Sequence, residues 1–333
     1  MKVSAKIVFY LLSYVPFLAS AQDINYFGAA YSPYVKSDGS HWNSYSLEDI
    51  KKMMRIMLTY HNAISTYSMG VNQWNVDGPW DKADSNCLIA RAAAEVNRDY
   101  NTVVLSVSIG IFQNDDPNIQ QKEIDNAFLA AEDANRIRAG TVWGLVFTNE
   151  YVGAGNAGQK VLNMIQSNKA RAQSMGLKVG TRTQICTQIW NGQNREILIE
   201  IAKASDFIMC NLYPEQNSDN ADAAVKGISD AYYSSRDGFR QHNGNLEVII
   251  GETGWASGGE TNPPQVNTVQ NQKDFWNAMK NWAASNRVKV HMFEAFDEPW
   301  KTGPSGEKEL GWWKRAPDNS NYYIEKSTGK RFD

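Results

Sequence analysis

Several features that would point to a metalloprotein, a nucleic-acid-binding protein or a glycosylated surface protein are scarce in this sequence or missing from it. Its 333 residues include four histidines and three cysteines, and the cysteines form no CxxC pair that would suggest zinc. The formal net charge is only −3, so a phosphate-rich partner is not expected. No Asn-x-Ser/Thr sequon occurs, so N-glycans are not expected either. We therefore expect no metal, no cofactor and no nucleic-acid partner.

The three cysteines, Cys87, Cys186 and Cys210, are far apart in the chain. An odd number of cysteines allows one disulfide with a remaining thiol, and three buried thiols are equally compatible with this spacing. The sequence leaves the pairing open.

The N-terminus has the form of a secretory signal. Two lysines accompany an apolar stretch at 7–18, and the "ASA" at 19–21 has the small-x-small form of a signal-peptidase site. A membrane anchor is the alternative, but the stretch is shorter than the roughly 20 residues of a spanning helix and contains Pro16. We predict a signal peptide at 1–21 and a mature chain from 22 onward that is secreted or in the cell wall, monomeric and without a membrane anchor.

The rest of the chain alternates short apolar runs with longer amphipathic segments. Eight runs rich in β-branched and aromatic residues occur, at 25–32, 61–68, 101–110, 141–150, 177–186, 205–214, 246–255 and 289–300. Seven helical patterns lie between them, with candidate N-caps at Ser46, Asn118 and Thr268. Near-continuous apolar runs are typical of parallel strands buried on both faces. The pattern predicts an α/β fold, a single (β/α)8 TIM barrel domain over 22–333, with an open doubly wound sheet as the alternative.

Acidic residues stand where several of these runs end. The fourth run ends on the pair Asn149-Glu150, Glu252 lies near the end of the seventh, and Glu294 and Glu298 lie in the eighth. In a barrel the active site lies at the C-terminal ends of the strands, so these side chains should meet at the barrel mouth. Any one of them alone could be a solvated residue at the start of a loop. Together they suggest the carboxyl pair that cleaves a glycosidic bond, one protonated and one ionised.

Five short motifs occur at these strand ends. They are "AYSPY" from Ala30, "VFTNEYV" around Glu150, "NLYP" from Asn211, "GETGWASGG" from Gly251 and "FEAFDEPWK" from Phe293. From 26 to about 313 the chain resembles glycoside hydrolase family 17, in particular the compact fungal-type β-1,3-glucanases and β-1,3-glucanosyltransferases. The resemblance implies a retaining mechanism on a (β/α)8 barrel with β-1,3-glucan as the substrate. It also implies that Glu150 is the acid/base and Glu252 the nucleophile.

The resemblance further implies a set of residues that bind the sugar or orient the nucleophile. Asn149 would hydrogen-bond the sugar 2-hydroxyl, and two tyrosines would orient the nucleophile. Two glutamates four residues apart, on one face of a strand, would join Lys301 in a polar cluster under the donor-side sugars, with a structural ion-pair cluster as the alternative. The whole expected set is Tyr31, Tyr67, Asn149, Tyr213, Trp255, Glu294, Glu298 and Lys301.

Tryptophans that follow strand ends are candidates for stacking on a sugar ring. Trp255, Trp300 and the pair Trp312-Trp313 are placed in this way, with loop anchoring as the alternative, whereas Trp143 lies inside a run and is expected in the core. One position departs from the family pattern: many relatives carry a basic residue two places before Tyr67, where this chain has Ser65. The electrostatics around Glu252 are therefore open.

The sequence as a whole favours a secreted retaining enzyme that acts inside β-1,3-glucan chains, by hydrolysis or by transfer to another glucan. A non-catalytic glucan-binding barrel is a second class of function, but such a barrel would be expected to lose one of the two carboxylates. A barrel enzyme for β-1,4-linked glycans would share the glutamates of the fourth and seventh strands but not the "FEAFDEPWK" ending.

Overall fold

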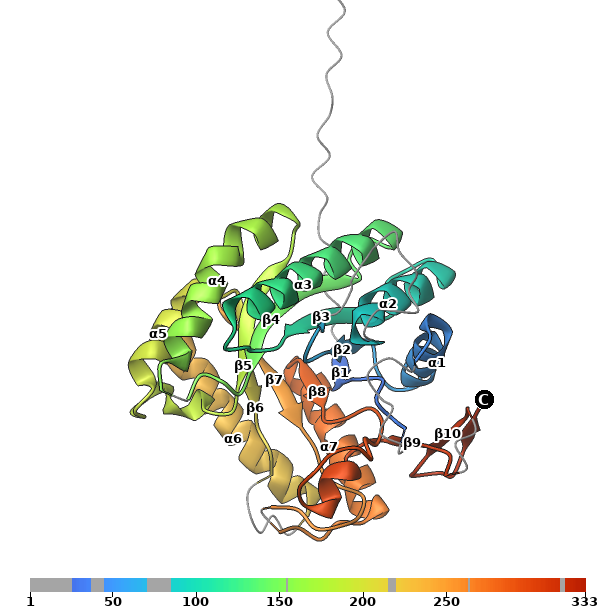
Figure 1. The fold of residues 1–333 in the computed structure, drawn as a ribbon. Helices are drawn as coiled ribbons and strands as arrows, with labels where there is room; N and C mark the ends of the chain where they lie inside the picture. Colours follow the sequence, from blue (N-terminus) through green and yellow to red (C-terminus); the bar gives the residue numbers. More distant parts are fainter. Residues whose placement is uncertain are drawn as a thin grey trace, which may run out of the picture.

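The computed structural model of the chain describes residues 26–36, 45–70, 85–153, 155–214, 220–262, 264–317 and 321–333. Eight parallel strands close into a barrel in chain order (Figure 1). They are β1 (Phe27–Ala30), β2 (Ala63–Ser65), β3 (Ser106–Ile111), β4 (Val142–Asn149), β5 (Lys178–Thr183), β6 (Phe207–Asn211), β7 (Glu247–Thr253) and β8 (Val290–Met292). The predicted (β/α)8 barrel is confirmed. The predicted signal peptide lies outside the described residues.

Seven α-helices in the described residues surround the strands. They are α1 (Leu47–Met57), α2 (Leu88–Asp99), α3 (Pro117–Ile137), α4 (Ala157–Ser174), α5 (Arg195–Ala204), α6 (Ala221–Arg240) and α7 (Val269–Asn286). Ser46 and Thr268 cap α1 and α7 as predicted. The N-cap predicted at Asn118 is wrong: Asp116 caps α3, because Pro117 suits the first helical position and the Asp116 side chain accepts from the Asn118 N–H.

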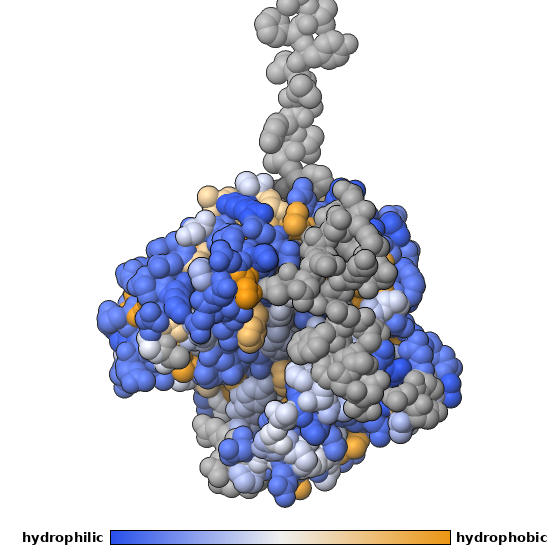
Figure 2. All heavy atoms as spheres, in the orientation of Figure 1, coloured by the Kyte–Doolittle hydropathy of each residue, from blue (hydrophilic) through white to orange (hydrophobic). Residues whose placement is uncertain are grey.

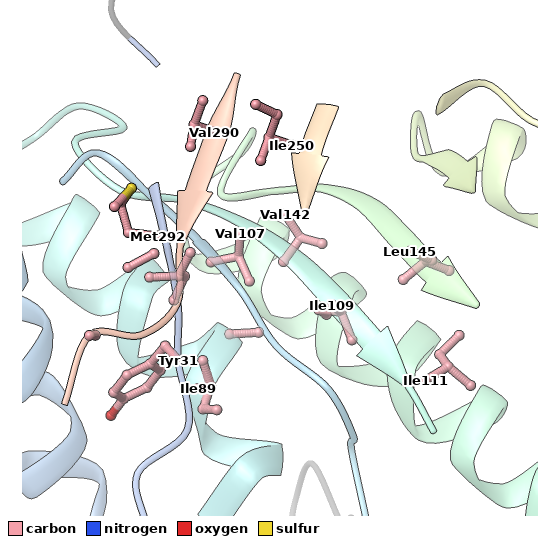
Figure 3. Packing of buried hydrophobic residues seen from close by; sticks show 14 of the residues in the cluster. Tyr31, Ile89, Val107, Ile109, Ile111, Val142, Leu145, Ile250, Val290 and Met292 are labelled. Carbon is pink, nitrogen blue, oxygen red and sulfur yellow. The ribbon is translucent and has the colours of Figure 1, made fainter. Parts of the chain in front are cut away.

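Strand side chains alternate between an outer and an inner core. Val107, Ile109 and Ile111 of β3 pack with Ile89 of α2 in the large cluster between strands and helices (Figure 3). A small separate cluster holds inward-facing residues of three strands, namely Val146, Phe207, Met209 and Ile249, with Trp143 packed against it as the sequence suggested. This inner cluster leaves the C-terminal half of the barrel interior to polar side chains.

A disulfide joins Cys186, at the start of the 3-10 helix η3 (Cys186–Ile189), to Cys210 of β6. Cys87 is a buried thiol at the end of a second such turn, η2 (Ser85–Cys87). The disulfide therefore ties the loop after β5 to the strand that also carries Asn211. Among the described residues no helix is long and apolar enough to cross a bilayer, and on the face drawn in Figure 2 apolar side chains are scattered among hydrophilic ones.

A small antiparallel sheet follows the barrel where an eighth helix would stand. After a 3-10 turn, η4 (Ser305–Lys308), the strands β9 (Trp313–Arg315), β10 (Tyr323–Glu325) and β11 (Arg331–Phe332) pair in the order β11-β10-β9. The sheet contacts the turn that follows α1, where the Tyr60 hydroxyl donates to Glu325 Oε1 at 3.0 Å. Its strands of two or three residues are too short to show an alternating apolar pattern, so the sequence did not predict them.

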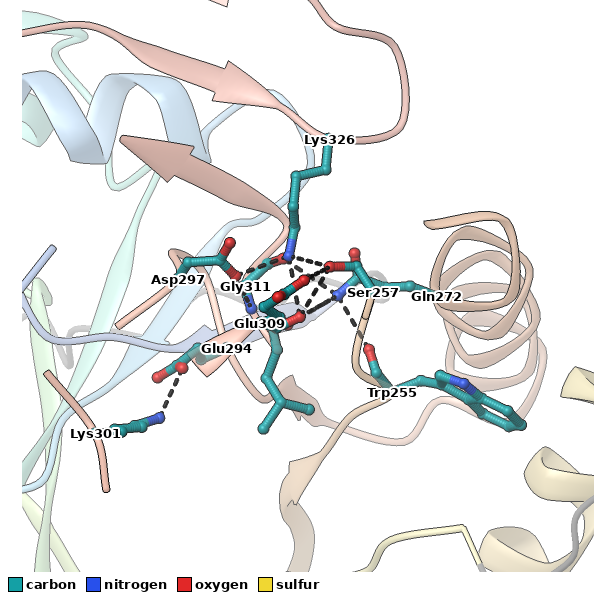
Figure 4. A network of polar contacts seen from close by, with 10 residues as sticks. Trp255, Ser257, Gln272, Glu294, Asp297, Lys301, Glu309, Gly311 and Lys326 are labelled. Atoms are coloured by element: carbon teal, nitrogen blue, oxygen red, sulfur yellow. Dashed lines mark hydrogen bonds and ion pairs between the residues drawn. The ribbon is translucent and has the colours of Figure 1, made fainter. Parts of the chain in front are cut away.

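A buried lysine fastens this sheet to the loops of the barrel mouth (Figure 4). Lys326 Nζ donates to Asp297 Oδ1 at 2.7 Å, to Ser257 Oγ at 2.8 Å and to the Glu309 carbonyl at 3.0 Å. Burial raises the pKa of Asp297 to about 6, although the Lys326 ammonium opposes that rise. Burial also lowers the pKa of Lys326. The charges of Lys326 and Asp297 therefore stabilise each other in the interior.

We predict that Lys326→Met lowers the free energy of unfolding by about 3–5 kcal/mol near pH 7.5, because it leaves the Asp297 carboxylate buried without its cation. The loss should be smaller near pH 5. A folded-state pKa that is raised above the unfolded value makes the folded protein bind more protons, so stability falls as pH rises through that range, and removing the cation strengthens this trend. Urea unfolding at both pH values measures the effect. The double variant Lys326→Met/Asp297→Asn is the control and should recover most of the stability; equal losses at both pH values would contradict the account.

Candidate active site

The end of β4 contains an irregularity that turns Asn149 toward the barrel axis. Val146 pairs with Gly180 but Asn149 pairs with Arg182, so β4 has one residue more than β5 over this stretch. Thr148 has φ 69° and Glu150 has φ 53°, values that are uncommon for such side chains. The Glu150 N–H donates to the Arg182 carbonyl at 3.0 Å, which holds Glu150 in this conformation. A bulge thus aims the Asn149-Glu150 pair into the mouth.

The strand β7 has a similar irregularity before its carboxylate. Cys210 pairs with Ile250 but Asn211 pairs with Glu252, so Gly251 is the additional residue. A Cβ on Gly251 would lie 2.7 Å from the Met209 Cβ, closer than side chains pack. Glycine is therefore required at this position, and the bulge brings Glu252 beside Asn211 at the barrel mouth.

Both carboxylates line one cleft of about 670 Å³ at the C-terminal ends of the strands. Among the predicted residues, Tyr67, Asn149, Glu150, Tyr213, Glu252, Glu298 and Lys301 line it, together with Ser32, Tyr34, Phe112, Phe293 and Trp300. The residues come from loops after β1, β2, β3, β4, β6, β7 and β8, so the cleft lies across the whole mouth. A cleft of this volume accommodates a drug-sized or oligosaccharide ligand.

Glu150 has the environment of a proton donor. The residue as a whole is exposed at the cleft, but partial desolvation raises the pKa of its carboxyl and the nearby Glu252 charge raises it further, while a hydrogen bond from Asn211 and the charge of Arg182 act in the opposite direction. The Asn211 Nδ2 donates to Glu150 Oε1 at 2.8 Å and lies 3.4 Å from Asn149 Oδ1. A carboxyl with a raised pKa keeps its proton at a pH where an ordinary one has lost it.

Glu252 is paired with a cation and with a hydroxyl donor. Its side chain is buried, Arg182 Nη1 lies 3.3 Å from Oε1, and the Tyr213 hydroxyl donates to Oε2 at 2.9 Å. Burial and the Glu252 charge raise the pKa of Tyr213 well above its usual value, so this phenol stays a donor. The Tyr67 ring lies under the Arg182 guanidinium, 4.5 Å from its carbon. Both predicted tyrosines thus lie beside the nucleophile candidate.

The predicted polar cluster forms at the side of the mouth that follows β8. Lys301 Nζ contacts Glu294 Oε1 at 2.7 Å and Glu298 Oε2 at 2.9 Å, and Ser32 hydrogen-bonds to Glu298. The prediction that Glu294 and Glu298 lie on one face of a strand is wrong. The strand β8 ends at Met292, and both glutamates lie in the segment after it. Burial and the charge of Glu298 raise the pKa of Glu294 well above its usual value.

The geometry brings together two carboxyl groups with different surroundings at one cleft. The pKa of Glu150 is raised by desolvation and by the nearby Glu252 charge, whereas Glu252 is paired with a guanidinium and a phenol. This is the pairing that general acid catalysis and nucleophilic attack at an anomeric carbon both require.

Comparison with known proteins decides the family. The BtgE/BtgC glycoside hydrolase domain matches residues 28–313. The chain belongs to this glycoside hydrolase family. The glucan 1,3-beta-glucosidase of Schizosaccharomyces pombe is 23% identical over 257 residues, which are 76% of this chain and 73% of the relative. The glucan 1,3-beta-glucosidase of Saccharomyces cerevisiae is 29% identical over 164 residues, 45% of this chain and 48% of the relative, so the match spans about half of that protein.

Solved structures similar to this BtgE/BtgC-type hydrolase support the same fold. An endo-laminarinase from Formosa Hel1_33_131 has a TM-score of 0.67 at 19% identity, over 87% of this chain and 83% of that one. The glycoside hydrolase family 17 beta-1,3-glucanosyltransferase from Rhizomucor miehei has a TM-score of 0.65 at 19% identity, over 89% and 97%. The resemblance to family 17 read from the motifs is confirmed.

Several aromatic residues of this BtgE/BtgC-type hydrolase lie elsewhere than expected. Tyr31 is buried and its hydroxyl donates to Met53 Sδ at 3.7 Å, and Trp255 is buried with its Nε1–H donating to the Val266 carbonyl at 3.2 Å. Trp312 and Trp313 are also core residues; Trp312 stacks on Trp276 at 4.7 Å. The prediction that these rings contact the sugar is therefore corrected, because other side chains cover the rings. Trp300 does line the cleft.

Two residues at the site were missed in the sequence. Asn211, the last residue of β6, lies within the sixth run and contacts Glu150, and Arg182 lies within the fifth run and contacts Glu252. A signal for Arg182 was available, since an arginine inside the run of a buried parallel strand must find a partner in the interior. Its partner depends on the closure of the barrel, which brings β2, β5 and β7 around one axis.

We predict that Tyr213→Phe lowers kcat by roughly 10–100-fold, because Glu252 loses a hydrogen bond to a charged acceptor. The acid limb of the pH–rate profile should also move to higher pH, since the ionised carboxylate has lost a donor. Tyr31→Phe is the matched control: its hydroxyl lies in the core, so its kcat and its pH profile should remain those of the unaltered enzyme. Steady-state kinetics across pH measure both. A larger effect from Tyr31→Phe than from Tyr213→Phe would contradict the placement of these two tyrosines.

Proposed function

We propose that this hydrolase cleaves β-1,3-glucan with retention of configuration, with Glu150 as acid/base and Glu252 as nucleophile. The observation that carries the proposal is the asymmetry of the two carboxyls: Glu150 has a raised pKa, whereas Glu252 contacts a guanidinium. The relatives named as glucan 1,3-beta-glucosidases and the laminarinase and glucanosyltransferase neighbours support β-1,3-glucan as the substrate class.

In the first proposed step, a Glu252 oxygen attacks the anomeric carbon while Glu150 donates its proton to the departing glycosidic oxygen. The C1–O bond to the leaving chain breaks with its electron pair, and an ester bond to Glu252 forms. Asn149, which lines the cleft beside Glu150, would bind the 2-hydroxyl of the reacting sugar. The first step leaves Glu150 ionised, and the Asn211 amide remains as its hydrogen-bond donor.

In the second step, Glu150 takes a proton from an incoming hydroxyl group, whose oxygen attacks the anomeric carbon. The bond to Glu252 breaks and the carboxylate leaves with the electron pair. Water gives hydrolysis, and a hydroxyl of a second glucan gives transfer. The Glu294–Lys301–Glu298 cluster offers charged hydrogen-bonding groups at the β8 side of the cleft, and we assign it to the donor-side sugars. We propose that the enzyme acts outside the cell or in its wall, as the predicted signal peptide implies.

We predict that Glu252→Ala and Glu150→Ala differ in the product of azide rescue. With an activated aryl β-laminaribioside, azide can replace the missing nucleophile of Glu252→Ala and should give the α-glycosyl azide. In Glu150→Ala the glycosyl-enzyme still forms, and azide, which needs no general base, should give the β-glycosyl azide. NMR of the products assigns the configuration. The Glu48→Gln variant on α1 is the control. Near-native rates on laminarin in either Ala variant would refute the assignment.

We predict that transfer competes with hydrolysis when glucan is concentrated. A sugar bound in the cleft beside the glycosyl-enzyme has a proximity advantage that a dilute acceptor lacks. Raising the concentration of laminari-oligosaccharides should therefore produce chains longer than the starting material, measured by mass and linkage analysis. If products never exceed the length of the substrate, the enzyme is a hydrolase alone. Cleavage of β-1,4-glucan in preference to laminarin would overturn the proposed substrate class.

A further inference from the structure

We propose that Arg182 is the positioning residue for both catalytic carboxylates, and that it delivers from β5 the positive charge that Ser65 on β2 does not provide. The inference rests on the proposed function of Glu150 and Glu252. Arg182 is 1% exposed and does not line the cleft, so it acts through other residues rather than on the sugar.

The guanidinium contacts residues of two other walls of the barrel, β7 and β2. On β7 its Nη1 lies 3.3 Å from Glu252 Oε1. At β2 its Nη2 donates to Ser65 Oγ and, at 3.1 Å, to the Thr66 carbonyl. Its carbon lies 4.5 Å from the centre of the Tyr67 ring, which makes a cation–π contact. These contacts fix the plane of the guanidinium and therefore the direction from which Glu252 meets a cation.

The backbone of the same residue fixes the other carboxylate. The Arg182 carbonyl accepts the Glu150 N–H at 3.0 Å, at the residue with φ 53°. Arg182 also stands opposite Asn149 in the β4–β5 register. One residue of β5 is thus bound through its main chain to the proton donor and through its side chain to the nucleophile. A displacement of Arg182 would change the position of one carboxyl relative to the other.

Small residues at two positions make room for the Arg182 side chain in the barrel interior. A Cβ on Gly251 would lie 3.1 Å from the Arg182 Cγ, so the glycine of the β7 bulge provides the space beside the stem. On the far side, Ser65 is short enough to accept the guanidinium where a longer basic residue would collide with it. The departure at Ser65 noted in the sequence therefore accompanies a cation that comes from β5 and contacts the Ser65 side chain.

The charge of Arg182 should matter in both chemical steps. Before attack it faces an ionised Glu252; in the glycosyl-enzyme the ester carries no charge, and in the second step the carboxylate leaves again as an anion beside the guanidinium. A fixed cation stabilises that leaving group without any reorganisation of solvent. Loss of the cation should therefore lower kcat much more than it changes KM.

Several ionisable groups surround Glu252 and define what a pH profile will report. They are Arg182 from β5, Tyr213 from β6, Tyr67 from β2, Glu150 from β4 and Glu294 from the segment after β8. Among them Arg182 supplies the positive charge nearest to the carboxylate pair, and it lowers the pKa of Glu150. Without it the ionised forms of Glu150 and Glu252 both lose a stabilising charge. The acid limb and the alkaline limb of the pH–rate profile should then both move to higher pH.

The test uses the whole mature enzyme with Arg182→Met, which keeps the volume of the stem, and Arg182→Lys, which keeps the charge. Arg182→Met should lower kcat by about 100-fold or more with KM changed by less than about threefold, and both limbs should move to higher pH. Arg182→Lys should leave the limbs near their original positions with an intermediate kcat. Arg171→Met, an exposed arginine of α4, is the control for loss of an arginine elsewhere.

A charge-swap variant keeps the proposal testable if Arg182→Met does not fold. Arg182→Ser should be nearly inactive, and Arg182→Ser/Ser65→Arg, which returns the guanidinium from β2, should recover at least about tenfold in kcat and restore the limbs. The inference would be overturned if Arg182→Met folds and the limbs of its pH–rate profile do not move. It would also be overturned if Arg182→Ser/Ser65→Arg recovers no kcat relative to Arg182→Ser. Failure of the proposed function looks different: Glu252→Ala would then cleave laminarin, or the unaltered enzyme would not.

Discussion

A guanidinium and a carboxylate that are both buried meet at the mouth of this barrel, where Arg182 contacts Glu252 at 3.3 Å. Buried charges persist in a protein only when each is paired and its remaining hydrogen-bonding groups are used. The surrounding features satisfy most of that condition, although the buried Nε of Arg182 has no hydrogen-bond partner among the described residues. Tyr213 donates to the second carboxylate oxygen, Ser65 accepts from the guanidinium, and the glycine in the β7 bulge makes room for the arginine stem. The geometry of the two candidate catalytic carboxyls follows from how this one pair is accommodated.

Two further buried cations hold the neighbouring loops by the same rule. Lys301 lies between Glu294 and Glu298, and Lys326 of the C-terminal sheet pairs with Asp297, which stands between those two glutamates in the chain. Lys301 thus holds the segment after β8 on its cleft side, and Lys326 holds it on the side of the small sheet (Figure 4). A sheet that lies outside the candidate active site consequently helps to position the donor-side wall of the cleft. In the described part of the chain, this sheet supports that wall on the side away from the cleft.

The sequence predicted those features that depend on periodicity along the chain. Alternating apolar runs and amphipathic helices indicated the barrel, and a glutamate at the end of a run was enough to place Glu150 and Glu252 at the mouth. Features that depend on contacts across the barrel were not predictable in this way. The bulges in β4 and β7 are defined only by the register of neighbouring strands. Trp255 follows a strand end as a cleft residue would, but its indole is directed into the core, where it packs on Phe275 of α7. Arg182 could have been noticed as a charge within an apolar run, although its partners come from strands distant in the sequence.

The central claim is that Glu252 forms a covalent bond to the sugar. The most direct measurement is mass spectrometry of the enzyme after incubation with an activated 2-deoxy-2-fluoro-laminaribioside, whose fluorine slows both steps and whose good leaving group restores the first one. The account predicts that one glycosyl group is added per chain and that peptide sequencing places it on Glu252. Complete turnover with no trapped species, or a label on any other residue, would contradict it.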